Sequence, residues 1–300
     1  MGTQPPAMNQ MLQDLVQVLE LEALEVNLFR GQSRDLGGKS VFGGQVLGQA
    51  LVAATRTVEA GRRAHSLHAY FLRPGDMAAP IVYEVERIRE GRSFVTRRVK
   101  AVQHGEPIFS MMASYQVREP GHEHQFPMPD VLPPEQLPTQ AELRHQTIER
   151  CPEKLRKGYL RQLAIEFKPV DPLDAFTPGR APPQQSIWFR AAGRLPDDPI
   201  LHQCVLTYAT DFNLLSTAML PHAISYLQPN IICASLDHVL WFHHDCRVDD
   251  WLLYAMDSPG AQGARGLSRG LIYNRDGLLV ASVAQESLMR DTSLTEESRK

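Results

Sequence analysis

The sequence predicts an α+β protein made of two similar halves, each with one helix packed against a long antiparallel sheet. In each half, one largely uncharged helix is followed by several segments in which apolar and polar residues alternate with period two. Local features also recur at an offset of about 170 residues, which indicates a duplicated domain.

The composition is typical of a globular protein. The chain has 300 residues, of which 43% are hydrophobic and 22% are charged. Its formal net charge of −3 argues against a dedicated nucleic-acid-binding protein, because such proteins depend on many cationic contacts to phosphate. No apolar run approaches the ~18 residues of a membrane-spanning helix, so we expect no membrane span.

The first half begins with a predicted amphipathic helix over 8–20 and a short strand over 24–30. A polar loop over 31–40 leads to a helix that starts near Gly43 and is almost free of charge. Its glycines Gly44 and Gly48 would permit another backbone to approach closely. Strands are then predicted over 65–73, 81–89, 93–102 and 107–117.

The second half follows a segment over 118–140 that contains six prolines and reads as a linker. Residues 140–158 are charged and predicted to be helical. Strands over 164–169 and 186–191 precede a helix that runs from Pro199 to Ala209, and further strands are predicted over 231–243, 251–256, 263–274 and 278–290. We therefore expect an N-terminal domain (1–118), a linker with a charged helix (119–160) and a C-terminal domain (161–300).

Two local matches define the repeat. The segment His68–Leu72 aligns with His238–Phe242, and the glycine hairpin at Gly105 aligns with the hairpin at Gly277. Both halves have the size of an ordinary domain, which favours duplication over a solenoid.

Two short motifs that suggest a function fail on their context. Residues 266–270 match the G-x-S-x-G pattern of serine hydrolases, but a hairpin rather than a helix follows Ser268, and no histidine lies downstream. The glycines after Gly43 lack the Lys-Ser/Thr pair of a phosphate-binding loop, so we interpret them as helix-packing residues.

Neither a metal site nor a cofactor is expected. The four cysteines have no Cys-x-x-Cys spacing and are predicted to be free thiols; they are Cys151, Cys204, Cys233 and Cys246. His243 and His244 lie near Cys246, but adjacent residues of a strand point to opposite faces and cannot easily share one ion.

Three polar residues of the second half are candidates for function. Asp211 follows the predicted helix among apolar neighbours, so its carboxylate must be hydrogen-bonded or functional. Ser235 and Gln285 lie on two mostly apolar strands. Taken alone, each also fits a hydrogen-bonded structural residue. The neighbours Asp237 and His238 are interpreted as structural, because they face opposite ways on a strand.

Longer motifs resemble the bacterial acyl-CoA thioesterase II family, from about Leu15 to Arg290. The resemblance is carried by Leu28–Ser33, Val41–Val46, His65–Asp76, Tyr208–Asp211, Leu236–His243 and Ala281–Glu286. It implies a double hotdog: two tandem hotdog domains, each a long antiparallel sheet wrapped around a central helix. It also implies hydrolysis of medium- to long-chain fatty acyl-CoA to fatty acid and CoA, by a cytoplasmic homo-oligomer, a dimer or tetramer.

The family's active site is an Asp, a Thr and a Gln that hold a water, and these positions fall on Asp211, Ser235 and Gln285. Serine in place of threonine keeps the hydroxyl and loses only a methyl group. We expect Asp211 to be ionised at neutral pH and to act as general base, while the other two orient the water. Backbone N–H groups at the start of the central helix are expected to stabilise the oxyanion.

The arginine pairs could contact the phosphates of CoA, but we interpret them as solvated surface residues; they are Arg62, Arg63, Arg97 and Arg98. The last three residues, 298–300, differ from the Ser-Lys-Leu peroxisomal signal, and residues 1–6 do not resemble a secretory signal. Both observations favour a cytoplasmic protein.

Three alternatives to hydrolysis by activated water remain open. A hotdog enoyl-CoA hydratase typically has an Asn and a His after a Gly-Asp pair, and neither follows Gly75-Asp76. A non-catalytic acyl-CoA-binding protein would have no need of the three polar residues. A cysteine-dependent thioesterase would need a base beside its thiol, and neither Cys204 nor Cys233 has an obvious partner.

Overall fold

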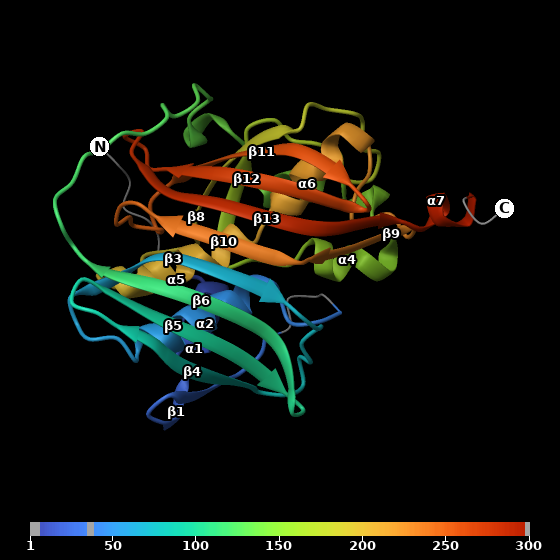
Figure 1. Cartoon of the computed structure of the whole chain (residues 1–300). Coiled ribbons are helices and arrows are strands. Elements are labelled where there is room, and N and C mark those ends of the chain that lie inside the picture. The colour runs from blue at the N-terminus through green and yellow to red at the C-terminus, as the bar shows by residue number, and fades with distance from the viewer. Residues whose placement is uncertain (1–6, 35–38, 298–300) are drawn as a thin grey trace.

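The computed structural model describes residues 7–34 and 39–297, and in them the strands form one antiparallel sheet that continues through both halves (Figure 1). The strand order is β1-β2-β4-β5-β6-β3-β10-β13-β12-β11-β8-β7, and β9 also pairs with β13. The expectation of a cytoplasmic protein depends on residues 1–6 and 298–300, which lie outside the described residues, as does part of the predicted loop over 31–40. No helix of the described chain is long and apolar enough to cross a membrane.

The elements of the first half follow the predicted order. They are α1 (Gln10–Leu19), β1 (Glu22–Glu25), β2 (Leu28–Gly31), α2 (Gly43–Thr55), β3 (Arg62–Phe71), β4 (Ile81–Glu90), β5 (Phe94–Gln103) and β6 (Glu106–Val117). The single strand predicted over 24–30 is instead a hairpin, because a turn at Val26 and Asn27 separates β1 from β2.

The linker contains helices, and the second half then repeats the order of the first. The elements are η1 (Pro134–Gln136), α3 (Gln140–Gln146), η2 (Ile148–Arg150), α4 (Glu153–Tyr159), β7 (Ile165–Pro169), β8 (Gln184–Ala191), α5 (Pro199–Thr210), α6 (Leu214–Met219), η3 (Leu220–His222), β9 (Ile231–Ser235), β10 (Asp237–Phe242), β11 (Leu252–Gln262), β12 (Arg265–Tyr273), β13 (Leu279–Asp291) and α7 (Thr292–Glu297). Neither α6 nor α7 was predicted. The strand predicted over 231–243 is interrupted at Leu236.

The two halves meet in the middle of the sheet, where β3 pairs with β10. Moving outward from this junction, the strands run β6-β5-β4-β2-β1 on one side and β13-β12-β11-β8-β7 on the other. This matching order confirms the predicted double arrangement. The hairpins at Gly105 and Gly277 also occupy matching places, between β5 and β6 and between β12 and β13.

The predicted alignment of His68 with His238 is wrong by an odd number of residues. His68 is exposed on the outer face of the sheet, whereas His238 is fully buried on the inner face. Since side chains alternate along a strand, residues on opposite faces cannot be structural equivalents.

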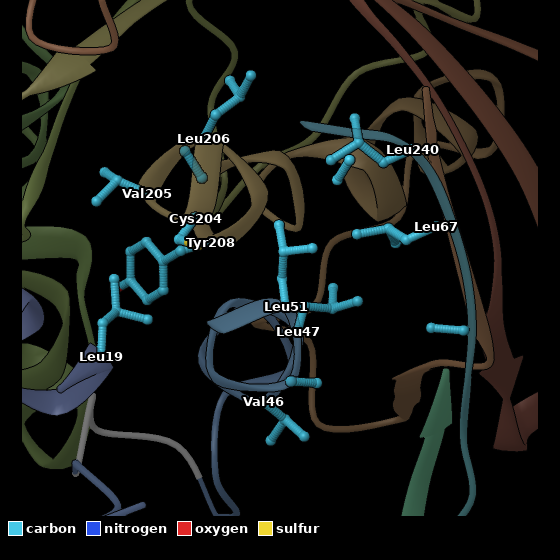
Figure 2. Packing of buried hydrophobic residues seen from close by; sticks show 14 of the residues in the cluster. Leu19, Val46, Leu47, Leu51, Leu67, Cys204, Val205, Leu206, Tyr208 and Leu240 are labelled. Carbon is cyan, nitrogen blue, oxygen red and sulfur yellow. The ribbon is translucent and has the colours of Figure 1, made fainter. Parts of the chain in front are cut away.

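The two long helices of the inner face pack closely on each other, as the glycines predicted. A β-carbon at Gly44 would lie 2.4 Å from the carbonyl oxygen of Tyr208, and one at Gly48 would lie 3.3 Å from that of Cys204. Figure 2 shows Leu47 and Leu51 of α2 in the same core as Leu67 of β3 and Leu240 of β10. The helices thus bring the start of α2 to the end of α5, where Asp211 lies.

Candidate active site

Asp211, Ser235 and Gln285 meet in one hydrogen-bonded cluster although they are far apart in the sequence. The hydroxyl of Ser235 donates to Oδ1 of Asp211 at 3.3 Å. The amide Nε2 of Gln285 donates to the same hydroxyl at 3.1 Å. The structure therefore brings together all three residues that the resemblance implied.

A bulge in the sheet explains how Ser235 reaches this cluster. Ser235 pairs with Ser287 of β13, whereas Val239 pairs with Ala284, so the chain between β9 and β10 has one residue more than its partner. The extra residue is Leu236, whose N–H still bonds to the carbonyl of Glu286. Such a bulge changes the face to which the following side chains point. It places both Ser235 and His238 on the inner face, beside Gln285.

Asp211 ends α5 and faces the first turn of α2. The backbone N–H of Gly44 donates to its carboxylate. A β-carbon at Gly43 would lie 2.7 Å from Oδ2, so the glycine leaves room for this approach. The N-cap residue of α2, Phe42, has no side-chain capping bond. The carboxylate from the second half therefore caps a helix of the first half, where the positive end of the helix dipole favours a negative charge.

The environment of Asp211 holds its pKa near neutrality. Burial raises the pKa from its ordinary value of 3.8 to about 7, while the bonds from Gly44 and Ser235 oppose this rise. Asp211 therefore titrates close to pH 7 instead of near its ordinary value, and its ionisation at neutral pH stays a prediction. A carboxylate with such a pKa can accept a proton from water and return it later in the reaction.

His238 also belongs to this cluster, although its position in the sequence indicated only a structural residue. Its Nδ1 lies 2.7 Å from Oε1 of Gln285, and its Nε2 lies 3.0 Å from the hydroxyl of Thr210. Burial lowers its pKa to about 4, so the imidazole is neutral at pH 7. Asp237 does point the other way, and its carboxylate accepts the N–H of Glu286 at 2.6 Å. Alternation separated the two residues correctly but could not tell which of them faces inward.

The rejected serine motif lies in mid-strand. Ser268 is on β12, directly opposite Gln285 of β13, and a strand rather than a helix follows it. Its buried hydroxyl has no hydrogen-bond partner within the described residues. A nucleophile elbow is therefore absent at this position.

The cysteines and the candidate metal ligands have no catalytic arrangement. All four cysteines are free, and burial raises the pKa of Cys204 to about 12 and that of Cys233 to about 11. Neither forms the thiolate that a nucleophile requires at neutral pH. No group of three or more His, Cys, Asp or Glu side chains able to hold a metal occurs in the described part of the chain.

The interpretation of Arg97 as a solvated residue is wrong. Its side chain is 1% exposed and donates to the hydroxyl and the carbonyl of Thr57, at 2.8 and 2.9 Å, and to Glu90 at 2.7 Å. The guanidinium therefore fixes the turn after α2. Arg98 does lie at the surface, where it pairs with Glu86.

The fold and the cluster define a class of protein. A hotdog-fold protein from Alicyclobacillus acidocaldarius is 20% identical, with a TM-score of 0.73 over 92% of this chain and 98% of that one, and this likeness concerns the fold alone. The acyl-CoA thioesterase II TesB2 of Mycobacterium marinum is 44% identical, with a TM-score of 0.76 over 92% of this chain and 98% of that one. The protein is a double hotdog, as predicted.

Its family follows from the sequence matches. The model of the acyl-CoA thioesterase family matches residues 164–288, and that of the acyl-CoA thioesterase N-terminal domain matches residues 32–116. Acyl-CoA thioesterase 2 of Haemophilus influenzae is 40% identical over 283 residues, 94% of this chain and 99% of that protein. The chain belongs to the acyl-CoA thioesterase family and is a thioester hydrolase.

Proposed function

We propose that this protein hydrolyses medium- to long-chain fatty acyl-CoA to free fatty acid and CoA, with Asp211 as the general base. Ser235 and Gln285 hold the attacking water beside it. The observation that supports this proposal is the convergence of the three side chains through bonds of 3.1 and 3.3 Å. The binding partners that we propose are therefore the acyl-CoA substrate and the CoA product. We propose no nucleic acid, metal or cofactor for this reaction.

The proposed reaction needs a base and a charge stabiliser. Asp211 accepts a proton as water attacks the thioester carbon, and it returns the proton to the sulfur of CoA when the carbon–sulfur bond breaks. General-base assistance of this kind contributes roughly 10²- to 10⁴-fold to the rate. The positive end of α2 lies beside Asp211 and would also favour the oxyanion that forms during attack.

A cavity of about 350 Å³ is a candidate site for the acyl chain, and both apolar and charged side chains line it. Its apolar wall comes from the linker segment, β8 and α6, and includes Leu143, Ile187 and Met219. Asn213 also lines it, two residues after Asp211, and its Nδ2 is buried without a partner among the residues described. The volume lies within the range of ~300–1,000 Å³ of ordinary ligand pockets. We propose that the acyl chain occupies this cavity.

The decisive experiment replaces Asp211 by asparagine. Release of CoA from palmitoyl-CoA is followed with a thiol reagent, and Asp211→Asn should lower kcat by roughly 10²- to 10⁴-fold with KM nearly unchanged. Asp237→Asn is the matched control, since Asp237 is a nearby carboxylate that bonds to the backbone of Glu286 outside the cluster. Wild-type turnover by Asp211→Asn would refute the general-base role. Absence of CoA release by the wild type would favour the hydratase or the binding protein.

We further propose that the protein is a cytoplasmic homo-oligomer, a dimer or tetramer, as the family resemblance implies. Cell fractionation tests the location, and sedimentation tests the state of assembly.

A further inference from the structure

A fully buried histidine holds Gln285 from the side opposite to Ser235. The imidazole of His238 is 0% exposed and lies between Gln285, at 2.7 Å from Nδ1, and Thr210, at 3.0 Å from Nε2. These two polar partners, from β13 and α5, carry no charge. The histidine bonds to neither Asp211 nor Ser235, so it can act on them only through the amide of Gln285 or through Thr210, the residue before Asp211.

The partners of His238 select one tautomer. A neutral imidazole has one N–H donor and one nitrogen acceptor. In the amide orientation of this structure, Nδ1 faces the oxygen of Gln285, which only accepts, and with this orientation Nδ1 carries the hydrogen. Nε2 then accepts the hydrogen of the Thr210 hydroxyl, which otherwise would point to the carbonyl of Thr207 at 2.9 Å.

This tautomer sets the direction of every bond that follows. With its oxygen held by His238, Gln285 presents its NH₂ group to the hydroxyls of Ser235 and Ser287, at 3.1 and 3.0 Å. Since Ser235 accepts that bond, its own hydrogen is free to point at Asp211. If the amide turned over, its oxygen would compete with Asp211 for this hydrogen.

We propose that His238 is a positioning residue, which donates from Nδ1 to Gln285 and thereby keeps the hydroxyl of Ser235 directed at Asp211. The bonds run in one direction, from Thr210 through His238, Gln285 and Ser235 to the carboxylate. A donor chain of this direction favours the ionised form of Asp211, which is the form that accepts a proton from water. The inference rests on the proposed function, in which Asp211 is the base.

Kinetics of His238→Phe test the proposal, because phenylalanine keeps a ring and removes both polar contacts. We expect kcat to fall by roughly 10- to 100-fold, the effect of one unpaired buried polar group, with KM unchanged. The acid limb of the kcat/KM profile should move to higher pH. Four groups interact with Asp211 and therefore influence the pKa that this profile reports. They are Gly44 of α2, Ser235 of β9, Tyr208 of α5 and Tyr254 of β11. His243→Phe is the matched control, since His243 bonds to Ser282 of the same β13 at 2.8 Å.

A double variant separates positioning from a general structural role. If His238 acts only through the amide, His238→Phe should cost nothing further in a Gln285→Leu background. Equal losses in both backgrounds would overturn the proposal, as would a His238→Phe enzyme with wild-type kcat and an unmoved pH profile.

Nitrogen NMR of the wild-type enzyme reports the tautomer of His238 and so tests the proposal even if His238→Phe does not fold. We expect the Nδ1-protonated neutral tautomer, and a spectrum with hydrogen on Nε2 would overturn the inference. The failure of the proposed function has a different signature, because Asp211→Asn would then keep full turnover whatever the tautomer of His238.

Discussion

At the scale of single residues, the site depends on a carboxylate held between two opposing effects. Burial disfavours the charge of Asp211, whereas the N–H of Gly44 and the hydroxyl of Ser235 favour it. The result is a pKa of about 7, well above the ordinary value of 3.8 for this group. The same residue can therefore exist as a base before attack and as an acid after it, at one working pH.

The pH profile should report this balance. In the proposed mechanism the active form of Asp211 is the ionised one, so kcat/KM should rise as pH increases through about 7. One unit below that pKa, roughly a tenth of the maximal value should remain. His238 does not add a second step in this range, because burial keeps its pKa at about 4. A kcat/KM that stays flat from about pH 5 to pH 8 would contradict the assignment.

Ser235 lies where the family resemblance implies a threonine. Ser235→Thr restores the family residue and keeps the hydroxyl that joins Gln285 to Asp211, so we expect activity within roughly threefold of the wild type. Ser235→Ala serves as the comparison, because it removes the hydroxyl and should lower kcat by roughly 10-fold or more. Steady-state assays with palmitoyl-CoA measure both. A folded but inactive Ser235→Thr would show that the serine does something other than hold water and Asp211.

At the scale of elements, the alternation of apolar and polar residues predicted the strands well, but it did not predict the irregularities within them. The segment 231–243 has the composition of one strand, and a bulge depends on pairing with β13, which no local pattern encodes. This single residue, Leu236, decides that Ser235 and His238 share a face. Helix α6 was missed because its six residues carry too short a pattern to show helical periodicity. The roles of Asp211, Ser235 and Gln285 came from family resemblance, since each alone reads as an ordinary polar residue.

The contact between α2 and α5 makes a prediction about Gly44. A β-carbon there would lie 2.4 Å from the carbonyl of Tyr208 and 2.5 Å from the ring of Phe42. Gly44→Ala should therefore destabilise the protein by up to about 2 kcal/mol, because an overpacking cost of ~1–3 kcal/mol is offset only in part by a gain of ~1 kcal/mol in helix propensity. It should also lower kcat, since the N–H of Gly44 bonds to Asp211.

Gly158 of α4 provides the control for this variant. A β-carbon at Gly158 would meet nothing within 4 Å, so Gly158→Ala should leave the stability unchanged or raise it by up to about 1 kcal/mol. Urea unfolding of the two variants measures the difference. Equal midpoints for both would mean that α2 and α5 can separate at no cost.

At the scale of the whole molecule, the duplication brings the two halves together in one site. The catalytic candidates come from the second half, whereas the helix end that faces Asp211 belongs to the first. The sequence predicted the repeat and its order of strands, because each half carries its own periodic pattern. It did not predict that the halves share the site, since the pairing of β3 with β10 and the packing of α2 on α5 are contacts between distant segments. The division at residues 118 and 160 stays a prediction.

The outer face of the central strands leads to the last prediction, which concerns assembly. Three apolar side chains are exposed there on neighbouring strands: Tyr70 of β3 at 61%, Met112 of β6 at 45% and Trp241 of β10 at 38%. Trp241 also contacts the ring of His68, at 5.5 Å between centroids. Exposed apolar groups that gather on one face mark interaction surfaces, and a second copy of the chain is the partner we expect. Met112→Glu should therefore lower the oligomeric state seen by sedimentation.

Phe126→Glu is the matched control for that experiment. Phe126 is 75% exposed in the linker, away from the central strands, so a new charge there should leave the assembly unchanged. If two copies of the sheet meet face to face, a carboxylate at Met112 would lose its hydration in the interface. That cost should weaken association by several kcal/mol. If Met112→Glu sediments like the wild type while Phe126→Glu does not, then the linker rather than the sheet forms the interface.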